Sequence, residues 1–285
     1  MAYMRLLSIF APMRNTVLMI CAACCTGCST SIKLTIPETF KEQATMQHVE
    51  GARGNKMSFA NFATSRIRRG MHTSDEGRGR GFVLENLLLN QVGIQKDETI
   101  KREKARFRYA LTDGKTRVEV FANEIALSDR VDYEAFNSTS IFSKISQLQQ
   151  YNYVFSAIIS ADTSQDGKSW ELLMTNIYQR KPGTGLRPFA FIRPDYNGLA
   201  TNGSDTIFVK AINIRKTEMP NGKTAQLPFE LLSGYELSTS DGVIAIVDMI
   251  DRNIWFYNEL DDTERLNIGG IATAIFARRV RDEKW

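Results

Sequence analysis

Residues 104–120 read KARFRYALTDGKTRVEV, and this stretch predicts two paired β-strands. From Lys104 to Tyr109 basic and apolar residues alternate, and apolar alternation resumes at Val118 after the pair Asp113-Gly114. Period-two alternation on both sides of an Asp-Gly pair is the strongest local signal for an antiparallel hairpin. We therefore expect a hairpin that turns at Asp113-Gly114.

The same arrangement recurs along the chain. Residues 151–180 alternate around Asp166-Gly167, and residues 206–237 alternate around Asn221-Gly222. A fourth turn, Asp241-Gly242, precedes the apolar run 243–250. These repeats predict a domain built mainly from antiparallel hairpins.

Residues 258–279 differ from this pattern and predict a helix. Asp261, Asp262 and Glu264 place acidic groups at its start, where the helix dipole favours them. Residues 268–276 have no polar face, and a helix that is apolar on every side must be surrounded by protein. The expected fold class is therefore a β-rich α+β domain, in which hairpins form a sheet or a closed barrel with a buried apolar C-terminal helix.

The barrel version is similar in layout to the tubby and phospholipid-scramblase architecture, where a closed barrel encloses an apolar C-terminal helix. The resemblance is one of layout alone, and a shared layout does not give a function.

All four cysteines lie within the short stretch CAACCTGC, residues 21–28. Arg5 and Arg14 are the only charged residues before Cys28, and residues 17–20 are apolar. A positive start, a short apolar run and small residues before a cleavage point are typical of a secretory signal peptide. Met13 begins a leader that is complete in itself, so it is an alternative start to Met1.

Cys25-Thr26-Gly27-Cys28 resembles the lipobox of bacterial lipoproteins. The resemblance implies that Cys28 is acylated, for example with palmitate, and becomes the first residue of the mature chain. Residues 21–24, Cys-Ala-Ala-Cys, are a second candidate, and a plain signal peptide or apolar anchor is the other interpretation. In this family an Asp after the cysteine commonly holds the protein at the inner membrane, so Ser29 implies the outer membrane.

The organisation that follows has three parts. Residues 1–27 are a signal peptide, residues 28–55 are the lipidated cysteine with a tether, and residues 56–285 are a single β-rich domain. Within residues 29–55, the alternating run 32–36 is either part of the tether or an edge strand.

Composition excludes several classes of protein. The chain has 36 Lys and Arg against 32 Asp and Glu, with two of the arginines in the leader, so the charge balance does not indicate nucleic-acid binding. No cysteine follows Cys28, so the mature chain has no thiol for a disulfide, a thiolate nucleophile or a cysteine-based metal site. No later segment has the length of apolar sequence that a transmembrane helix requires.

No catalytic site can be identified from motifs. The two histidines, His48 and His72, lie in polar surroundings, and no Gly-x-Ser-x-Gly sequence is present. The pairs Asp248 with Asp251 and Asp261 with Asp262 could act as an acid and a base only if they lined a cleft. We predict no cofactor and no metal, and we leave the catalytic residues unassigned.

Charge is unevenly distributed along the chain. Residues 53–108 hold 13 basic and six acidic residues, whereas residues 241–264 hold seven acidic and one basic. The basic segment would suit an anionic membrane surface or phosphate groups, and the other interpretation is alternate charges on solvated strand faces.

The function expected from these features is that of a membrane-anchored cell-envelope lipoprotein, acting as a non-enzymatic binding or structural module. Its partners would be the membrane, reached through the lipid anchor, and envelope proteins. The alternatives are an envelope hydrolase, acting for example on glycans, and a carrier of a lipid or apolar ligand.

Overall fold

The structure is a computed structural model, and it describes residues 33–34, 36–78, 94–135, 144–161, 169–179, 197–218 and 224–279. The predicted leader, Cys28 and the turns Asp166-Gly167 and Asn221-Gly222 lie outside these residues. The chain divides into two units. The larger, Leu34–Arg215 with Pro228–Trp285, contains the barrel described below. The smaller is Met1–Lys33 with Lys216–Leu227, and its described part consists of Lys33 and the adjoining ends of β11 and β12.

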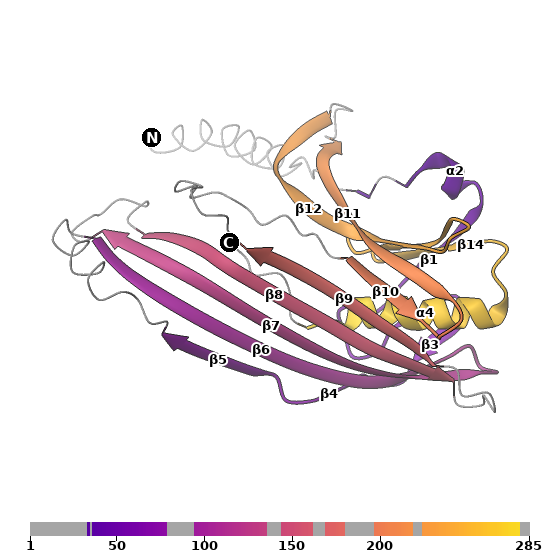
Figure 1. The fold of residues 1–285 in the computed structure, drawn as a ribbon. Coiled ribbons are helices and arrows are strands. Elements are labelled where there is room, and N and C mark those ends of the chain that lie inside the picture. Colours follow the sequence, from indigo (N-terminus) through magenta and orange to yellow (C-terminus); the bar gives the residue numbers. More distant parts are fainter. Residues whose placement is uncertain are drawn as a thin grey trace, which may run out of the picture. The chain divides into compact units, whose positions relative to one another are not determined.

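Antiparallel neighbours follow one another in chain order over most of the sheet (Figure 1). The first hairpin has the predicted turn, and its strands pair from Ile94↔Ala135 to Thr112↔Arg117. Asp113 Oδ1 accepts hydrogen bonds from the amides of Lys115 (2.8 Å) and Thr116 (2.6 Å), which holds the turn. The strands of this meander are β6 (Ile94–Thr112), β7 (Arg117–Ala135), β8 (Lys144–Ala161), β9 (Trp170–Gln179), β10 (Asn197–Thr201), β11 (Thr206–Glu218), β12 (Thr224–Ser238), β13 (Val243–Asp248) and β14 (Asn253–Tyr257).

The N-terminal part of the chain closes this sheet into a barrel. One end of the meander pairs with β1, in the register Ala44↔Tyr257, and the other end pairs with β3. Glu50, just after β1, exchanges two backbone hydrogen bonds with Ser58 in β2, so the two ends meet. The elements concerned are α2 (Glu38–Lys41), β1 (Ala44–His48), β2 (Ser58–Phe59), β3 (Phe62–Thr64), β4 (Arg68–Arg69) and β5 (Thr73–Arg78), of which β4 and β5 pair with β6.

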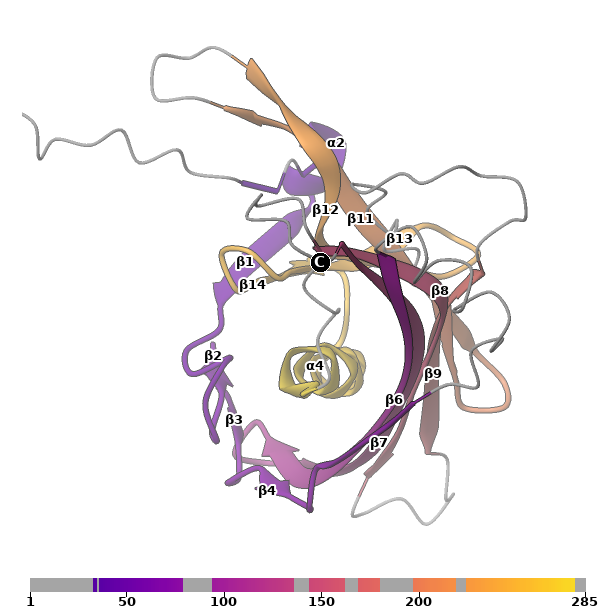
Figure 2. The same cartoon turned by 90° about the vertical axis from the view of Figure 1, so that its left-hand side faces the viewer.

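The interior of the barrel is filled by helix α4 (Asp262–Ala277), as the view along its axis shows (Figure 2). Asp261 and Glu264 form a capping box at its N-terminus, because each side chain accepts a hydrogen bond from the backbone of the other residue. Every residue from Ile268 to Ala277 is buried. The prediction of a buried apolar C-terminal helix inside a β-rich domain is thus confirmed.

Two glycines let the wall approach the helix. A Cβ on Gly270 would lie 2.9 Å from Cγ2 of Ile159 in β8, and one on Gly269 would lie 3.2 Å from Cζ of Phe59 in β2. Thr273 is the polar member of the helix interior, and its hydroxyl accepts a 2.7 Å hydrogen bond from the Tyr109 hydroxyl in β6. Among the described residues, no helix has the length and apolar character needed to cross a bilayer.

The boundary predicted at residue 55 needs correction, because part of the segment assigned to a tether belongs to the barrel. β1 pairs along its whole length with β14, and Val49 and Ala52 are core residues. The run 32–36 is not a strand in its described part: Leu34 and Ile36 are buried but lie outside regular secondary structure. Leu34 Cδ2 lies 3.3 Å from the position that a Cβ on Gly234 would occupy, so it packs on the outer face of β12.

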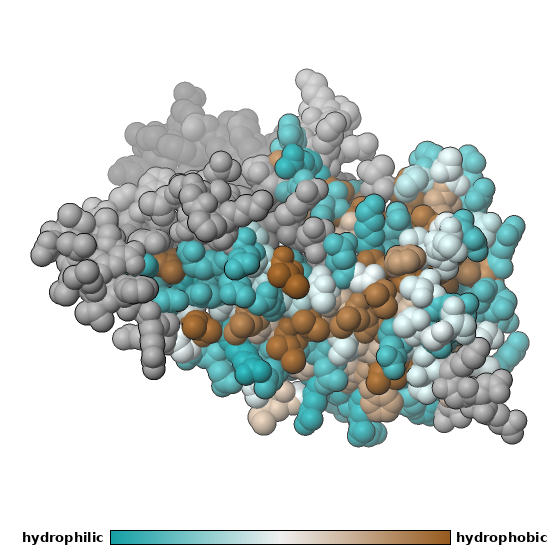
Figure 3. All heavy atoms as spheres, viewed as in Figure 1, coloured by the Kyte–Doolittle hydropathy of each residue, from teal (hydrophilic) through white to brown (hydrophobic). Residues whose placement is uncertain are grey.

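The outer face of the wall is unusually apolar between β7 and β11. Eight of the eleven exposed large apolar side chains in the described part of the chain lie there, and Figure 3 shows them as a brown patch on the front of the sheet. Cross-strand pairs link them: Phe121 with Ile158, Ile125 with Val154, and Leu199 with both Leu173 and Phe208. We call this set the apolar band: Phe121, Ile125, Val154, Ile158, Leu173, Ile177, Leu199 and Phe208.

Candidate functional site

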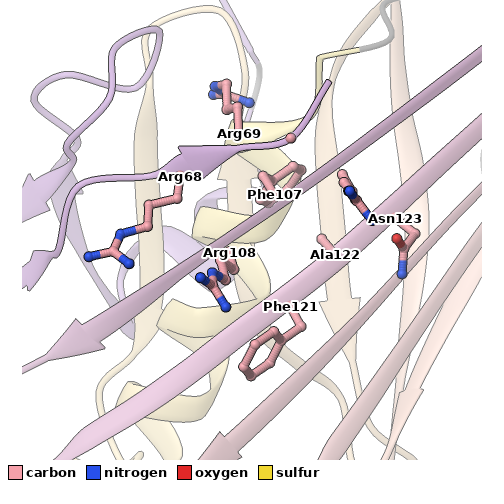
Figure 4. A pocket seen from close by; sticks show the side chains of 9 residues that line it. Arg68, Arg69, Phe107, Arg108, Phe121, Ala122 and Asn123 are labelled. Atoms are coloured by element: carbon pink, nitrogen blue, oxygen red, sulfur yellow. The ribbon is translucent and has the colours of Figure 1, made fainter. Parts of the chain in front are cut away.

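A hollow of about 460 Å³ lies on the outer wall where β4 runs beside β6 (Figure 4). Its position follows from the register, because β4 pairs with β6 through Arg68↔Arg108 and Arg69↔Phe107, and β6 pairs with β7 through Arg108↔Phe121 and Arg106↔Asn123. We call it the basic groove. Its lining residues are Arg68, Arg69, Gly70, Arg106, Phe107, Arg108, Phe121, Ala122 and Asn123.

The charges in the basic groove are all of one sign. Arg68 and Arg108 are both exposed and directly opposite each other, and like charges in such a cross-strand pair are destabilising. Arg106 adds a third guanidinium two residues along the same face of β6. None of the nine lining residues is acidic, and within the described part of the chain no salt bridge joins these three arginines to a carboxylate. An anion bound between them would relieve the repulsion.

Gly70 shapes one side of the basic groove. It follows the short strand β4, and its amide donates a 2.9 Å hydrogen bond to the carbonyl of Arg106. A Cβ at this position would lie 2.6 Å from Cγ and 2.7 Å from Nε of Arg106. The glycine therefore leaves the space across which the Arg106 side chain lies.

Arg69 does not share the outward direction of Arg68, because alternate residues of a strand face opposite sides of the sheet. Its guanidinium points inward, donates a 2.7 Å hydrogen bond to the carbonyl of Ala277 and lies 5.5 Å from the ring centre of Phe107. Burial, together with the nearby charge of Arg279, lowers the pKa of Arg69. It supplies a partner to one of the carbonyls left free at the C-terminus of α4.

A partly buried network of hydrogen bonds completes that end of the helix. Arg278 donates to the Tyr235 hydroxyl (2.6 Å) and to the carbonyl of Ile275 (3.1 Å), and its guanidinium lies 5.0 Å from the ring centre of Tyr235. Glu124 accepts hydrogen bonds from the Arg279 amide (2.7 Å) and the Tyr153 hydroxyl (3.2 Å). Burial raises the pKa of the Tyr235 hydroxyl, so the phenol stays neutral. Cations near the C-terminus of a helix interact favourably with its dipole. We therefore assign this network a structural role at the end of the barrel where α4 finishes.

The residues considered as catalytic candidates do not converge on a site. His48 Nδ1 lies 2.9 Å from Asn253 Oδ1 in the neighbouring strand, and His72 Nε2 lies 3.6 Å from Glu103 Oε1. In the ranges that the structure describes, no three His, Cys, Asp or Glu side chains are grouped in a way that could hold a metal ion.

The two acidic pairs have local structural roles. Asp248 Oδ1 accepts hydrogen bonds from the amides of Ile250 and Asp251 in the turn after β13. Burial raises the pKa of Asp248, although these amide hydrogen bonds oppose the shift. Asp261 caps α4, as described above.

The basic groove was missed in the sequence because Arg68 and Arg108 are forty positions apart. A signal was nevertheless present: Arg102, Lys104, Arg106 and Arg108 occupy every second position, and the structure places all four on the outer face of β6. We call these four residues the basic row. The excess of positive charge in residues 53–108 thus includes a one-sided surface feature.

Comparison with known proteins gave no match. No family model, curated protein or solved structure shows significant similarity to the chain.

Proposed function

We propose that the protein is a lipid-anchored lipoprotein of the bacterial cell envelope, and that its barrel is a binding module whose basic groove takes an anionic group. The anchor is Cys28, acylated after removal of residues 1–27, and Ser29 directs the protein to the outer membrane. The single observation that carries the binding function is the basic groove, with three outward arginines and no acidic lining residue.

The ligand class follows from the donors. Guanidinium groups recognise phosphate and carboxylate through paired N–H donors, and Arg106 and Arg108 offer such donors from one face of β6. Phe121 and Asn123 add an apolar surface and an amide beside them. An arginine stays protonated near neutral pH and is therefore suited to binding rather than to proton transfer. A phosphate or carboxylate group on a larger envelope molecule is the ligand we propose.

The filled interior supports a module that binds through its outer wall. Leu266, Ile271 and Ile275 of α4 pack in the barrel core. The helix therefore occupies the space in which a carrier would hold an apolar ligand. This arrangement weighs against the carrier alternative. It also directs the search for a ligand to the outer wall.

The anchor is tested by metabolic labelling with palmitate. We expect label in the wild-type protein and in a Cys24→Ala variant, and neither label nor signal cleavage in Cys28→Ala. Label retained by Cys28→Ala would refute the assignment. Fractionation that places the protein wholly in the inner membrane would refute the destination.

The basic groove is tested by melting the chain that starts at Ser29 in increasing inorganic phosphate, with chloride at matched ionic strength as the reference. A ligand that binds the folded state raises the melting temperature as its concentration exceeds the dissociation constant. Arg106→Gln with Arg108→Gln should abolish the phosphate-specific rise. Arg215→Gln should retain the phosphate-specific rise, because it removes an arginine of β11 that already pairs with Glu230 of β12. An equal rise in both variants would exclude the basic groove as the site.

A further inference from the structure

We infer that the apolar band and the basic row together form a docking face for an anionic lipid bilayer, so that the barrel lies against the membrane to which its lipid holds it. The inference extends the proposed function, because it takes the anchor at Cys28 as its starting point. It adds a second contact, made by the folded wall and independent of the acyl chains.

The first observation is that the apolar band lies directly beside the basic row. The basic row runs along β6, and β7 beside it carries Phe121 and Ile125 on the same outer face. Register places Lys104 opposite Ile125 and Arg108 opposite Phe121. Apolar side chains that enter the head-group region, next to cations that meet anionic lipid phosphates, are the two attractions by which peripheral proteins hold a bilayer.

The second observation is the mixture of charge across the face. Acidic side chains are also present on this face: Asp75 lies opposite Arg102 of the basic row, and Glu171 lies opposite Ile158 of the apolar band. Lys104, Arg106 and Arg108 have Thr73, Asn123 and Phe121 among their cross-strand neighbours, none of them acidic. The centre of the basic row therefore presents net positive charge beside the apolar band.

The third observation is the reach of the anchor. Leu34 packs on the outer face of β12, and only residues 29–33 separate it from the acylated cysteine. A fully extended chain covers about 3.3–3.6 Å per residue, so this point of β12 lies within about 20–22 Å of the lipidated residue. β12 is the neighbour of β11, which carries Phe208 at the edge of the apolar band. The band thus begins one strand away from the place where the anchor segment joins the barrel.

A bilayer accounts for these three features together. Its anionic head groups match the charge of the basic row, its acyl region matches the apolar band, and the short segment after Cys28 keeps the barrel near it. A second copy of the chain docked on the band would account for the apolar side chains alone, so it serves as the rival in the test.

The test uses the chain from Ser29 onward, which lacks the acyl anchor but holds every described strand and α4. Co-sedimentation with vesicles of phosphatidylcholine should be weak, and adding phosphatidylglycerol should raise binding, which high salt then reduces. Val154→Thr, Leu173→Thr and Ile177→Thr combined should weaken binding at least about tenfold, since threonine keeps the strands but removes most of the apolar surface. Lys104→Gln combined with Arg102→Gln should also weaken vesicle binding, by about fivefold or more for each charge removed. Met46→Thr, which lies on β1 away from both the apolar band and the basic row, is the control and should bind as wild type.

A second readout shows which wall meets the lipid. The chain from Ser29 has no cysteine, so a single Ile158→Cys or Met46→Cys can carry an environment-sensitive dye. The two native side chains are equally exposed, 46% and 47%, but lie on β8 and β1. We expect the dye at position 158 alone to shift to the blue with anionic vesicles. Each of four results would overturn the inference. These are no binding to vesicles, unchanged binding of the threonine variant, equal dye shifts at both positions, and a wild-type dimer that the threonine substitutions dissociate. Palmitate labelling of Cys28 is unaffected by any of these results, so a failure of the docking face is distinguishable from a failure of the anchor.

Discussion

The hydrogen bond between Tyr109 and Thr273 joins the wall of the barrel to the helix inside it, and it gives a quantitative prediction. The two hydroxyl oxygens are 2.7 Å apart, and both side chains are buried. Thr273→Val keeps the shape of the side chain but leaves the Tyr109 hydroxyl buried without this partner. An unsatisfied buried polar group costs about 1–3 kcal/mol, so we expect that loss in the free energy of unfolding. For a domain of this size the melting temperature should fall by about 2–4 °C for each kcal/mol.

A double-mutant cycle then separates this contact from other effects. Tyr109→Phe removes the donor, while the Thr273 hydroxyl keeps its 2.8 Å hydrogen bond to the carbonyl of Gly269, so the loss should be only about 0.5–1.5 kcal/mol. The double variant should lose less than the sum of the singles by about 0.5–3 kcal/mol, because it leaves no unpaired group. Urea unfolding of the chain from Ser29 measures all four corners. Strictly additive losses would show that the two residues are not in contact, and would refute the placement of the helix.

Three further predictions concern the buried end of the barrel and one turn. Ala272→Asp, which places an unpaired charge in the core, should give a chain that is aggregated or lacks a cooperative melt, whereas Ala272→Ser should still melt cooperatively. Arg278→Met should lose about 1.5–3 kcal/mol in urea unfolding, since it removes the hydrogen bonds that a charged side chain donates to Tyr235 and to the carbonyl of Ile275, and a loss below about 0.5 kcal/mol would contradict a structural role for this network. Burial raises the pKa of Asp248, so the stability that it contributes is present at low pH and is lost as the pH rises through its folded pKa. Asp248→Asn should therefore melt at the same or a higher temperature than wild type at pH 7, with the difference vanishing toward pH 3; a lower melting temperature at pH 7 would show that the charge is required.

The sequence was sufficient to predict the hairpins and the helix because their signals are local. Asp113-Gly114 marks a turn whose flanking strands alternate, and Gly114 has the positive φ (91°) that such a turn accommodates. The acids at residues 261–264 mark a capping box. These features require no knowledge of distant contacts.

The lengths of the strands could not be predicted in the same way. β6 starts at Ile94, although its apolar alternation starts only at Ala105. Figure 1 shows β6, β7 and β8 continuing past the end of α4. A strand without a helix to pack against has no reason to alternate, so its sequence gives no sign of the pairing with β5 and β7 that the structure shows.

Closure of the barrel and the outer-wall features depend on contacts between distant residues. None of the side chains of residues 44–48 is fully buried, yet these residues help to close the sheet, because backbone hydrogen bonds to β14 suffice at a short strand. Both faces of β8 are apolar at Val154-Phe155 and Ile158-Ile159, which marks a strand but does not say which face is inside. The structure shows that Phe155 and Ile159 face the core, and this is what identifies Val154 and Ile158 as part of the apolar band.

Amide hydrogen exchange in the chain from Ser29 tests most directly the claim that α4 is the core around which the barrel is closed. The amides of residues 268–277 lie inside the wall, so we expect them to exchange only through global unfolding, with protection that matches the free energy of unfolding measured in urea. The exposed turn at residues 113–116, whose hydrogen bonds can open locally without unfolding of the barrel, should exchange much faster in the same sample. Exchange of residues 268–277 as fast as that turn, with the strands still protected, would show that the helix is outside the barrel and would contradict the account.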